Sequence, residues 1–494
     1  MNYYIVALVA FISYILYKCY IYPLYLSPLR KIPGPPIDSF ILGHYDTFLN
    51  KQIGEASARL AKKYGSIVRY HGIFNKPYLL IADPKVVQRV LVNRSYDYPK
   101  HFININTTKD LVGGDGILLS HGDSHKRQRK MMHPSFAFTN VKEMFPTFAQ
   151  GGHKLKDIWM KQIGNKEEER ITITAMIPKV TLDVIGLVGF NYEFNSTTSN
   201  SELAQAYKLA VSRNSSQLYE TFEALFPFIR KLPTPFYTQF HDSIKMIKNV
   251  SENLVAEKQH ATVQGKDLLS LLVKANENLP VDEQLTHEEL HSQVMTLLLA
   301  GHETTSTALS WALYFLARNP EVQDRLRKEI LEVLTDRDHI PTFDEIEQLK
   351  YLECVFKETL RIVPPVPALF RATSQNEVMN GYVVPEGTPM LIAIYAIHHD
   401  PSIWGDDAEY FNPSRWLDPE IKQKVTSSNF LPFGAGPKSC LGMKMAHLEL
   451  KAILSIIIRN FEFRVVEGFT FKKTLIGLSK PIPGIDLFVS KVNY

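Results

Sequence analysis

One long helix in the second half of the chain sets the size that the fold must reach. Residues 286–319 are largely apolar, Thr286 and Glu289 have the spacing of an N-terminal capping box, and Asn319 stands before a proline, where helices end. At ~1.5 Å per residue, a helix of this length spans roughly 50 Å. It would cross a whole domain, so the sequence predicts a large body around it. A chain of 494 residues with 45% hydrophobic residues can supply that body, as one large domain or two.

The middle of this helix, residues 300–305 (AGHETT), has an unusual composition. A glycine, a charged residue and two threonines are poor helix formers, and here they interrupt an apolar run. Threonine hydroxyls can also bond to the carbonyls of the preceding turn and bend a helix. A solvated polar patch is the alternative interpretation, but leucine, alanine and tryptophan residues flank the segment. The composition therefore favours a function for these polar side chains.

The remaining sequence predicts a mainly α fold with a minor β portion. Amphipathic runs with capping residues and proline stops recur from about residue 125 to residue 360, and again after Cys440. Residues 66–83 contain two β-rich runs separated by an Asn-Lys-Pro turn, which is typical of a hairpin. Residues 381–400 have the same pattern, so we expect a second hairpin there.

The N-terminal residues have the composition of a membrane anchor. Residues 2–17 carry no charge, and residues 3–22 supply the ~20 mostly apolar residues that cross a bilayer, with tyrosines toward both ends. A cleaved signal peptide and a buried core helix are the alternatives, but the basic n-region and the small-residue cleavage site of a signal peptide are missing. Arg30 and Lys31 follow the apolar run, so the positive-inside rule puts the downstream chain in the cytoplasm.

A proline-rich segment separates this anchor from the rest of the chain. Residues 31–36 (KIPGPP) exclude helix and sheet ladder, and they predict a stiff spacer. The expected organisation is a single transmembrane anchor (1–27), a proline-rich linker (28–40) and one large domain (41–494).

Charge and cysteine content limit the partners and the compartment. A net charge of +4 is small for this length, so the balance does not indicate a nucleic acid partner. The three cysteines, Cys19, Cys354 and Cys440, are too few and too scattered for a disulfide framework. A reducing compartment that faces the cytosol fits this pattern.

Cys440 lies in a glycine-rich turn, PFGAGPKSCLG (residues 432–442), and a run that predicts a helix begins at the cysteine. The thiolate is the reactive form of cysteine, and a helix N-terminus or a nearby cation such as Lys438 lowers the pKa of the thiol. Gly434, Gly436 and Gly442 allow positive φ angles and close approach of a flat cofactor. This setting predicts a metal ligand or a nucleophile.

Other interpretations of the turn fit the residues less well. A P-loop would need glycines where Pro432 and Pro437 stand. A structural zinc site would need a second cysteine or a histidine pair at ligand spacing. A lone catalytic nucleophile remains an open alternative.

Taken together, these motifs resemble those of the cytochrome P450 family of haem-thiolate monooxygenases, over nearly the whole chain and in the family's order. Phe433, Gly436, Cys440 and Gly442 match the highly specific signature F-x-x-G-x-R-x-C-x-G. The resemblance implies that Cys440 is the proximal iron ligand of haem b (iron protoporphyrin IX), where a thiolate favours O–O cleavage. It also implies that residues 41–494 form the haem-binding catalytic domain.

A helical charge pair also matches the family. Glu358 and Arg361 in KETLR correspond to its E-x-x-R motif, and Arg415 in FNPSRW corresponds to the third member of the network. E-x-x-R alone is weak, because Glu167 and Arg170 fit it too and such pairs are usually helix surface. The resemblance implies that the three residues support the cysteine turn from behind, which is a structural role.

The AGHETT segment matches the position above the haem iron. There Glu303 and Thr304 correspond to an acid–alcohol pair that relays protons to reduced oxygen through ordered water. Ala300 stands where some fatty-acid hydroxylases of the family carry a glutamate that esterifies the haem. The resemblance therefore implies haem that is not covalently attached.

Four side chains correspond to partners of the two haem propionates. Arg371 and Arg129 match the family, whereas His125 and Lys438 replace its usual tryptophan and arginine. Both replacements can donate to a carboxylate, but lysine lacks the bidentate fork of arginine. We expect altered propionate geometry and retained haem, and a plain surface histidine is the alternative for His125.

A basic cluster precedes this region and could receive an electron donor. Lys126, Arg127, Arg129 and Lys130 form either a solvated helix face or part of the basic surface that docks a separate NADPH-dependent flavoprotein reductase in this family. The chain carries no G-x-G-x-x-G dinucleotide motif, so electrons must come from such a partner.

The resemblance as a whole implies a single-pass enzyme of the endoplasmic reticulum membrane, with its catalytic domain in the cytoplasm, that inserts one atom of O₂ into a lipophilic substrate. A haem-thiolate isomerase or dehydratase is an alternative, although such an enzyme needs no acid–alcohol relay. A non-catalytic haem-binding membrane sensor is another. Residues 105–120 and 222–240 lie where the family has substrate loops, and phenylalanines there suggest an apolar substrate, though core packing explains them equally well. AGHETT resembles the microsomal branch of the family, so the resemblance implies a fatty-acid-like, steroid-like or xenobiotic substrate.

Overall fold

The computed structural model describes residues 2–49, 54–101, 105–198, 202–211, 223, 225–261, 265–473 and 478–492. The α-helices in chain order are α1 (Asn2–Leu16), α2 (Tyr45–Leu49), α3 (Glu55–Tyr64), α4 (Pro84–Gln88), α5 (Ile105–Leu111), α6 (Gly122–Met132), α7 (Phe138–Glu143), α8 (Phe145–Ile163), α9 (Ile173–Phe190), α10 (Glu202–Val211), α12 (Pro235–His260), α13 (Leu268–Glu277), α14 (His287–Arg318), α15 (Pro320–Val333), α16 (Phe343–Ile346), α17 (Lys350–Ile362), α18 (Ile394–His398), α19 (Pro401–Trp404), α20 (Pro419–Lys424) and α21 (Met443–Asn460).

The strands are short and few beside these helices. They are β1 (Ile67–His71), β2 (Pro77–Ile81), β3 (Glu168–Thr172), β4 (Leu369–Ala372), β5 (Glu377–Met379), β6 (Tyr382–Val384), β7 (Pro389–Ile392), β8 (Phe461–Val465), β9 (Lys472–Lys473), β10 (Pro481–Ile482) and β11 (Asp486–Lys491). The prediction of a mainly helical chain with a minor β portion is confirmed.

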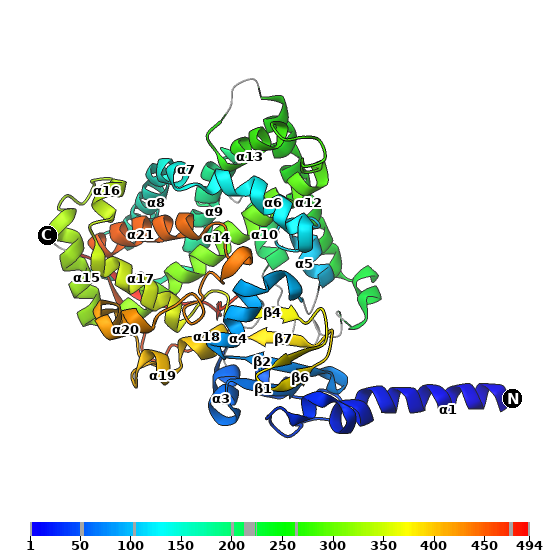
Figure 1. The fold of residues 1–494 in the computed structure, drawn as a ribbon. Helices are drawn as coiled ribbons and strands as arrows, with labels where there is room; N and C mark the ends of the chain where they lie inside the picture. Colours follow the sequence, from blue (N-terminus) through cyan, green and yellow to red (C-terminus); the bar gives the residue numbers. More distant parts are fainter. Residues whose placement is uncertain are drawn as a thin grey trace.

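Helix α14 runs through the middle of the molecule, as its length predicts (Figure 1). Its N-terminus is a capping box: the Glu289 amide donates to Thr286 Oγ1 at 3.2 Å, and the Thr286 amide donates to Glu289 Oε2 at 2.9 Å. It packs against α9, α12, α17 and α21. Most of its side chains are buried along the whole length, so the helix is the centre of the larger hydrophobic core.

The largest sheet has the strand order β1-β2-β7-β4 and lies on one side of the helical body (Figure 1). The predicted hairpin at residues 66–83 is confirmed: β1 and β2 pair antiparallel, with Ile67 opposite Ile81 and His71 opposite Pro77. A second, smaller hydrophobic core forms around this sheet.

The second predicted hairpin, at residues 381–400, is wrong. Strand β6 pairs with β5, whereas β7 joins the large sheet between β2 and β4, and residues 394–398 form helix α18. All four residues of β7 are buried. A central buried strand takes partners on both sides, so its pairing is decided by strands that are distant in sequence.

The N-terminal apolar run is helical and stands clear of the body. Helix α1 continues as a π-helical segment, Tyr17–Leu26, and Figure 1 shows α1 projecting away from the sheet side of the molecule. The helical stretch Tyr3–Lys31 has a mean hydropathy of 1.8 over its most apolar window, and none of that window is buried. The buried core helix alternative is therefore wrong. The other long apolar helix, α9, is mostly buried against α14.

The proline-rich segment lies on the body; it begins with a 3₁₀ turn, Pro28–Lys31, and has no helix or strand over residues 33–37. Leu29 and Ile32 are buried in the smaller core. The Arg69 amide donates to the Pro33 carbonyl at 2.8 Å, and a Cβ on Gly34 would stand 2.0 Å from the Arg69 carbonyl oxygen. The N-terminus stands free of the body over α1: the segment Tyr17–Leu26 already packs against residues 73–75, with Pro23 buried, and Pro33 then docks against β1.

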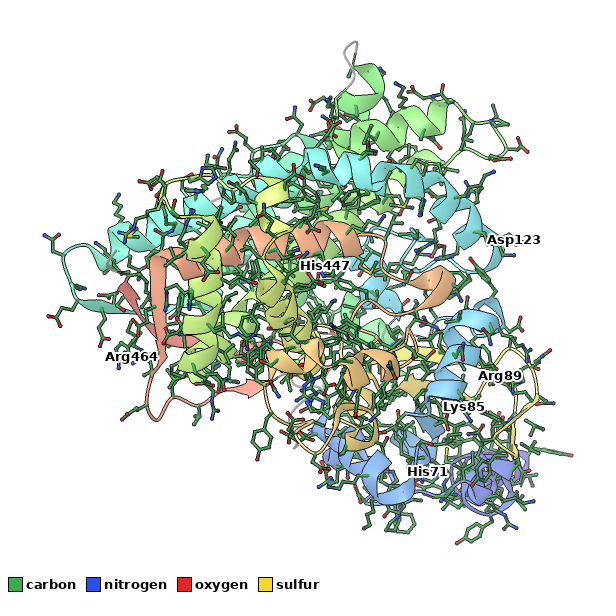
Figure 2. All side chains as sticks on the ribbon, turned by 60° about the vertical axis from the view of Figure 1, so that its left-hand side comes forward. His71, Lys85, Arg89, Asp123, His447 and Arg464 are labelled. Carbon is green, nitrogen blue, oxygen red and sulfur yellow. The ribbon has the colours of Figure 1, made fainter. Side chains whose placement is uncertain are left out.

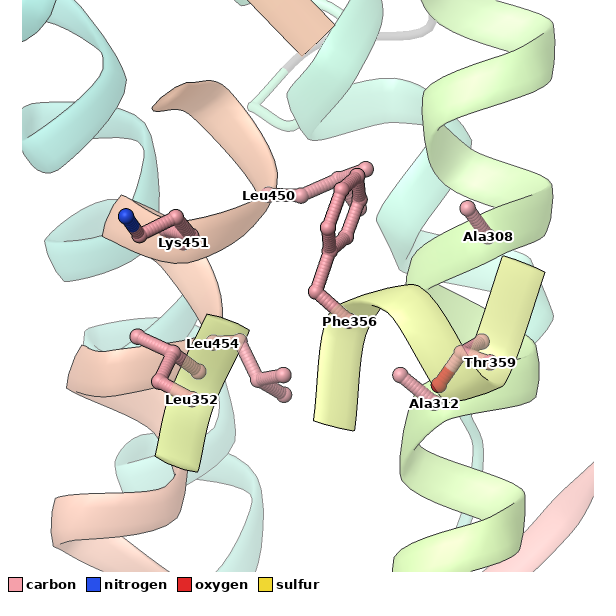
Figure 3. A pocket seen from close by; sticks show the side chains of 8 residues that line it. All are labelled: Ala308, Ala312, Leu352, Phe356, Thr359, Leu450, Lys451 and Leu454. Atoms are coloured by element: carbon pink, nitrogen blue, oxygen red, sulfur yellow. The ribbon is translucent and has the colours of Figure 1, made fainter. Parts of the chain in front are cut away.

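Helices α14, α17 and α21 meet around a small void (Figure 3). Its volume is about 10 Å³, and its lining is almost entirely apolar: Ala308, Ala312, Leu352, Phe356, Thr359, Leu450, Lys451 and Leu454. The one hydroxyl there, on Thr359, already donates to the Val355 carbonyl at 2.9 Å. An apolar space of this size without a free polar partner stays dry, so these three helices are tightly packed.

Candidate functional site

The Cys440 turn is held by its own backbone and by its glycines. The Cys440 amide donates to the Phe433 carbonyl at 2.8 Å, which closes the loop around a 3₁₀ turn at Gly436–Lys438. Gly434 and Gly436 have φ angles of 69° and 67°. A Cβ on Gly436 would also stand 2.2 Å from the Leu91 carbonyl oxygen. Only glycine fits at Gly436.

Two expectations about the cysteine itself need correction. Gly442 has a negative φ of −84°, and α21 begins at Met443 instead of at the cysteine. Cys440 is exposed, but desolvation by the surrounding protein raises the pKa of its thiol, although the Gly442 amide and Arg129 act to lower it. Lys438 Nζ donates to the Ser95 carbonyl, so Arg129 is the cation that acts to lower the pKa of the Cys440 thiol. A thiol of raised pKa becomes a thiolate when a metal ion binds it.

The predicted charge network is confirmed, and it is fully buried. Arg361 contacts Glu358 through both nitrogens of its fork, Nε to Oε2 at 2.9 Å and Nη2 to Oε1 at 2.8 Å. Arg415 Nε donates to Glu358 Oε1 at 2.9 Å. The Trp416 Nε1 and the Asn412 amide also donate to this carboxylate, each at 2.9 Å. The rival motif lies elsewhere: Arg170, on β3, pairs with Asp486.

His398 connects this network to the cysteine turn, and its role was not predicted from the sequence. Arg361 Nη1 donates to the His398 carbonyl at 2.7 Å, and His398 Nδ1 donates to the Arg361 carbonyl at 3.2 Å. His398 Nε2 then accepts the Leu431 amide at 2.9 Å. Leu431 directly precedes the turn, so the network supports the loop through one imidazole. Burial holds the pKa of His398 well below its usual range.

Four cationic side chains gather beside the turn. Arg129 Nη1 donates to the Ser439 carbonyl at 2.6 Å, and Lys438 Nζ donates to the Ser95 carbonyl at 2.6 Å. Arg371 is almost fully buried on β4, next to Lys100, with which it forms a backbone bridge. The structure thus brings the predicted Arg129, Arg371 and Lys438 together.

Lys100 is a member of this group that sequence reasoning missed. Burial lowers its pKa to about 7, and the positive charges of Arg371, Lys438 and Arg129 add to the effect. Its Nζ donates to the carbonyls of Ile117 and Leu118 at 2.8 and 2.7 Å. A lysine without a motif around it gives no signal in a single sequence, so only the fold could identify it.

His125 belongs to the same cluster and is not a surface residue. It is buried, and its Nδ1 lies 3.2 Å from the Tyr96 hydroxyl. Burial lowers its pKa to about 3, with further lowering by Lys100, Lys438 and Arg129. The surface-histidine alternative is therefore wrong, and His125 is a neutral hydrogen-bonding group among cations.

This cluster fits a dianionic group. Burial lowers the pKa of Lys438 to about 8, with a contribution from Arg371, and burial lowers the pKa of Arg371 to about 10. The buried Nε of Arg371 has no hydrogen-bond partner among the described residues. Cations that repel one another at partly buried positions are stabilised by carboxylates, and the two propionates of haem supply such charges.

One face of α14 opens in the middle of the otherwise buried helix. Ala300 is exposed and Thr304 is half-buried one turn later, whereas His302, Glu303 and Thr305 are buried. Thr304 Oγ1 donates to the Ala300 carbonyl at 2.8 Å. Glu303 is directed to other partners, since its carboxylate forms an ion pair with Lys480 and lies 3.5 Å from His302 Nε2.

The basic cluster on α6 is less free than its sequence indicates. Lys126 pairs with Asp123 at 2.9 Å, at the periphery of the molecule in Figure 2, and Lys130 pairs with Glu283 at 3.1 Å. Arg127 is directed inward to Glu289 at 2.5 Å. Arg129 contacts the cysteine turn instead of solvent. Lys126 and Lys130 remain as the exposed cations of this helix.

The two candidate substrate segments meet across a buried polar contact. Thr107 Oγ1 and the Tyr237 hydroxyl donate to Glu223 at 2.7 and 3.0 Å. Arg230 lies 3.4 Å from the same carboxylate and also pairs with Asp110. Residues 222 and 224 of the second segment lie outside the described residues. The contact joins α5 to the start of α12.

Comparisons with known proteins agree with this arrangement. The family model described as Cytochrome P450 matches residues 33–489. Cytochrome P450 monooxygenase 128 of Postia placenta is 32% identical over 92% of this chain and 90% of its own length. Cytochrome P450 monooxygenase sphH of Aspergillus fumigatus is 30% identical over 92% and 86%, and a ganoderic acid synthetase of Ganoderma lucidum is 29% identical over 91% and 90%.

The structure thus combines a cysteine in a glycine-dependent turn with a buried charge network and a cluster of cations. These features accompany a match to the family model over most of the chain. Members of that family bind haem b through a cysteine thiolate and use O₂, a small substrate and a redox partner. The chain belongs to the cytochrome P450 family of haem-thiolate monooxygenases.

Proposed function

We propose that this protein is a single-pass enzyme of the endoplasmic reticulum membrane whose cytoplasmic domain inserts one atom of O₂ into a lipophilic substrate, with electrons from a separate NADPH-dependent flavoprotein reductase. The observation that carries the proposal is the Cys440 turn with its four adjacent cations. The exposed apolar helix at the N-terminus supports the anchor. Arg30 and Lys31 at its end support the cytoplasmic orientation.

Each residue of the site has a definite task in this proposal. Cys440 supplies the thiolate ligand, on a loop that Phe433 and Gly436 shape. Arg129, Arg371, Lys438 and Lys100 neutralise the propionates. His125 donates a hydrogen bond in the same region. The bound haem supplies the redox chemistry that activates O₂, and Ala300 leaves room for it without a covalent link.

Thr304 on the open face of α14 and the buried Glu303 beside it manage protons. The Thr304 hydroxyl can exchange its bond to the Ala300 carbonyl for one to ordered water, because a threonine that bonds back to its own helix loses little when it turns. The Glu303 carboxylate is the nearby group that can take up and release a proton. This pair argues against an isomerase or dehydratase, which needs no such relay.

A reconstitution experiment tests the function. The holoenzyme is combined with reductase, NADPH, ¹⁸O₂ and a panel of fatty-acid, steroid and xenobiotic probes, and product is analysed for one ¹⁸O atom. Turnover of peroxide probes without NADPH or O₂ would support the isomerase or dehydratase instead. Haem binding without any reductase-dependent oxygen consumption would support the non-catalytic membrane sensor.

Thr304→Ala should lower the product formed per NADPH by ~10-fold or more and raise peroxide release, because one proton carrier is lost. Peroxide and product are measured in the same reconstituted assay. Thr305→Ala is the matched control: Thr305 bonds to the Gly301 carbonyl at 3.1 Å in the same manner but is buried. Equal coupling in Thr304→Ala and the parent would remove Thr304 from the relay.

Removal of residues 2–26 should release the protein from membranes and leave its haem spectrum unchanged. A deletion that continues through residue 32 should instead destabilise the domain by several kcal/mol, since each buried aliphatic side chain such as Leu29 or Ile32 contributes about 2–5 kcal/mol. Membrane pelleting and thermal unfolding measure the two effects. A shorter protein that still pellets with membranes would point to a second attachment surface.

A further inference from the structure

Glu303 is held by a lysine from the far end of the chain. Lys480, next to β10, forms an ion pair with Glu303 Oε2. The side chain of Glu303 is only 8% exposed, whereas that of Lys480 is 29% exposed. A buried carboxylate requires a charged partner or it loses its charge. The pair therefore ties the polar centre of α14 to the C-terminal segment.

The position of Lys480 is fixed by the residue before it. Trp311 Nε1, on α14, donates to the Ser479 carbonyl at 2.6 Å. The Ser479 amide donates to the Pro365 carbonyl at 2.8 Å, and Ser479 Oγ donates to the Pro364 carbonyl at 2.7 Å. Ser479 is fully buried by these contacts. The backbone beside Lys480 is thus docked on both α14 and the segment that follows α17.

His302, the other neighbour of Glu303, cannot replace Lys480 while it is neutral. Its Nδ1 lies 2.5 Å from the Leu298 carbonyl, and a carbonyl only accepts, so Nδ1 carries a proton. In a neutral imidazole of that tautomer, Nε2 has a lone pair and no proton. Nε2 is the atom that faces Glu303 at 3.5 Å. Lys480 is therefore the partner that can always donate to the carboxylate.

We propose that Lys480 is a positioning residue for proton transfer: it holds Glu303 ionised at the C-terminal segment, and Glu303 takes up and delivers a proton only when this pair opens. The inference rests on the proposed monooxygenase function and adds a control point to it. Burial alone would raise the pKa of Glu303, whereas a protonated His302 and Lys480 both lower it, to about 2 when both act. A carboxyl of such acidity is a poor proton donor at neutral pH.

The proton balance shows where the control acts. Hydroxylation consumes the substrate RH, O₂, two electrons from the reductase and two protons, and it yields ROH and water. Each proton that passes through Glu303 enters from solvent, binds the carboxylate oxygen that Lys480 has released, and moves on to the reduced oxygen. Glu303 is ionised again and can re-form the pair. When delivery fails, O₂, two electrons and two protons leave as H₂O₂.

The test measures peroxide released per NADPH against pH, without substrate, in the reductase-reconstituted holoenzyme. The parent should give a flat profile between about pH 5 and pH 8, since Glu303 stays ionised throughout. Lys480→Met keeps the length of the side chain and removes its charge, so it should introduce a step of about twofold or more in that window. Lys480→Arg should restore the flat profile.

Two further comparisons test whether Glu303 causes the pH-dependent step. Combining Lys480→Met with Glu303→Gln should remove it, while Lys266→Met, which breaks the exposed pair Lys266–Glu143, should leave the parent profile unchanged. A flat profile for Lys480→Met, or a step that survives Glu303→Gln, would overturn the proposal.

A second measurement does not depend on turnover. Infrared titration should reveal in Lys480→Met at neutral pH a carbonyl stretch of a protonated buried carboxyl in addition to that of Glu449, whose pKa burial raises well above its usual value, and this additional band should be missing in the parent and in the double variant. If the parent fails to consume O₂ with reductase, the proposed function is wrong, and the infrared band still decides whether Lys480 keeps Glu303 ionised. Identical infrared titrations of Lys480→Met and the parent would refute the inference.

Discussion

A Cys440→Ser variant should lose the strongly red-shifted Soret band that the dithionite-reduced, carbon-monoxide-bound parent displays, and its reductase-dependent oxygenation should fall to the background of the assay. Serine keeps the shape of the side chain and the hydrogen bond from the backbone amide to the Phe433 carbonyl, so the loop should still fold. It cannot offer a thiolate, which is the ligand that favours O–O cleavage. Spectra of freshly purified protein are the direct measurement.

Cys354→Ser is the matched control for this change. Cys354 is buried on α17, and burial raises the pKa of its thiol too. Serine there should leave the red-shifted band in place at full height. If the band persists in Cys440→Ser, another group ligates the iron. If neither the parent nor the variant binds haem, the replacements at His125 and Lys438 disturb the propionate site more than the cation cluster indicates.

Glu358→Gln should destabilise the protein by about 3–5 kcal/mol and reduce its retention of haem. The amide keeps the size of the carboxylate but removes the carboxylate partner of Arg361, and it leaves Arg415 with Asp407 as its remaining counter-charge. Removal of one partner from a buried charge network is far more harmful than the loss of a surface pair. Urea unfolding of the holoenzyme and the rate of haem loss measure the two effects.

Glu409→Gln is the control, because Glu409 lies in the segment between α19 and Arg415 and has most of its side chain in solvent. We expect its effect to stay within about 0.5 kcal/mol. Replacing Arg415 by methionine in the Glu358→Gln background should destabilise much less than the sum of the single changes, because the two residues share one network. Strict additivity would mean that the network does not act as a unit.

Local motifs explain why the centre of this fold was predictable. The capping box and the terminal proline define α14 from a few neighbouring residues. The glycines of the cysteine turn are required by backbone conformation and by a close contact with Leu91, so they leave a clear pattern. The Glu358 network was found because two of its members are three residues apart on one helix.

Features that depend on distant parts of the chain were mispredicted or missed. Residues 381–400 contain the strands β6 and β7 and the helix α18, and the strands pair with β5, β2 and β4 instead of with each other, so the local hairpin pattern was misleading. Lys438 has the expected position, and the direction of its side chain is set by carbonyls near residue 95. Lys100 and Lys480 have no motif at all, because their partners are brought to them only by folding.

The imidazole of His398 makes the cysteine turn sensitive to acid. Its Nε2 can accept the Leu431 amide only while that nitrogen carries no proton, so a proton and the loop compete for the same lone pair. In the unfolded chain, a histidine binds a proton below about pH 6.5, whereas the folded protein keeps His398 neutral to a much lower pH. Each pH unit below that value therefore favours the unfolded chain by up to about 1.4 kcal/mol at this one site. At near-neutral pH the contact is preserved.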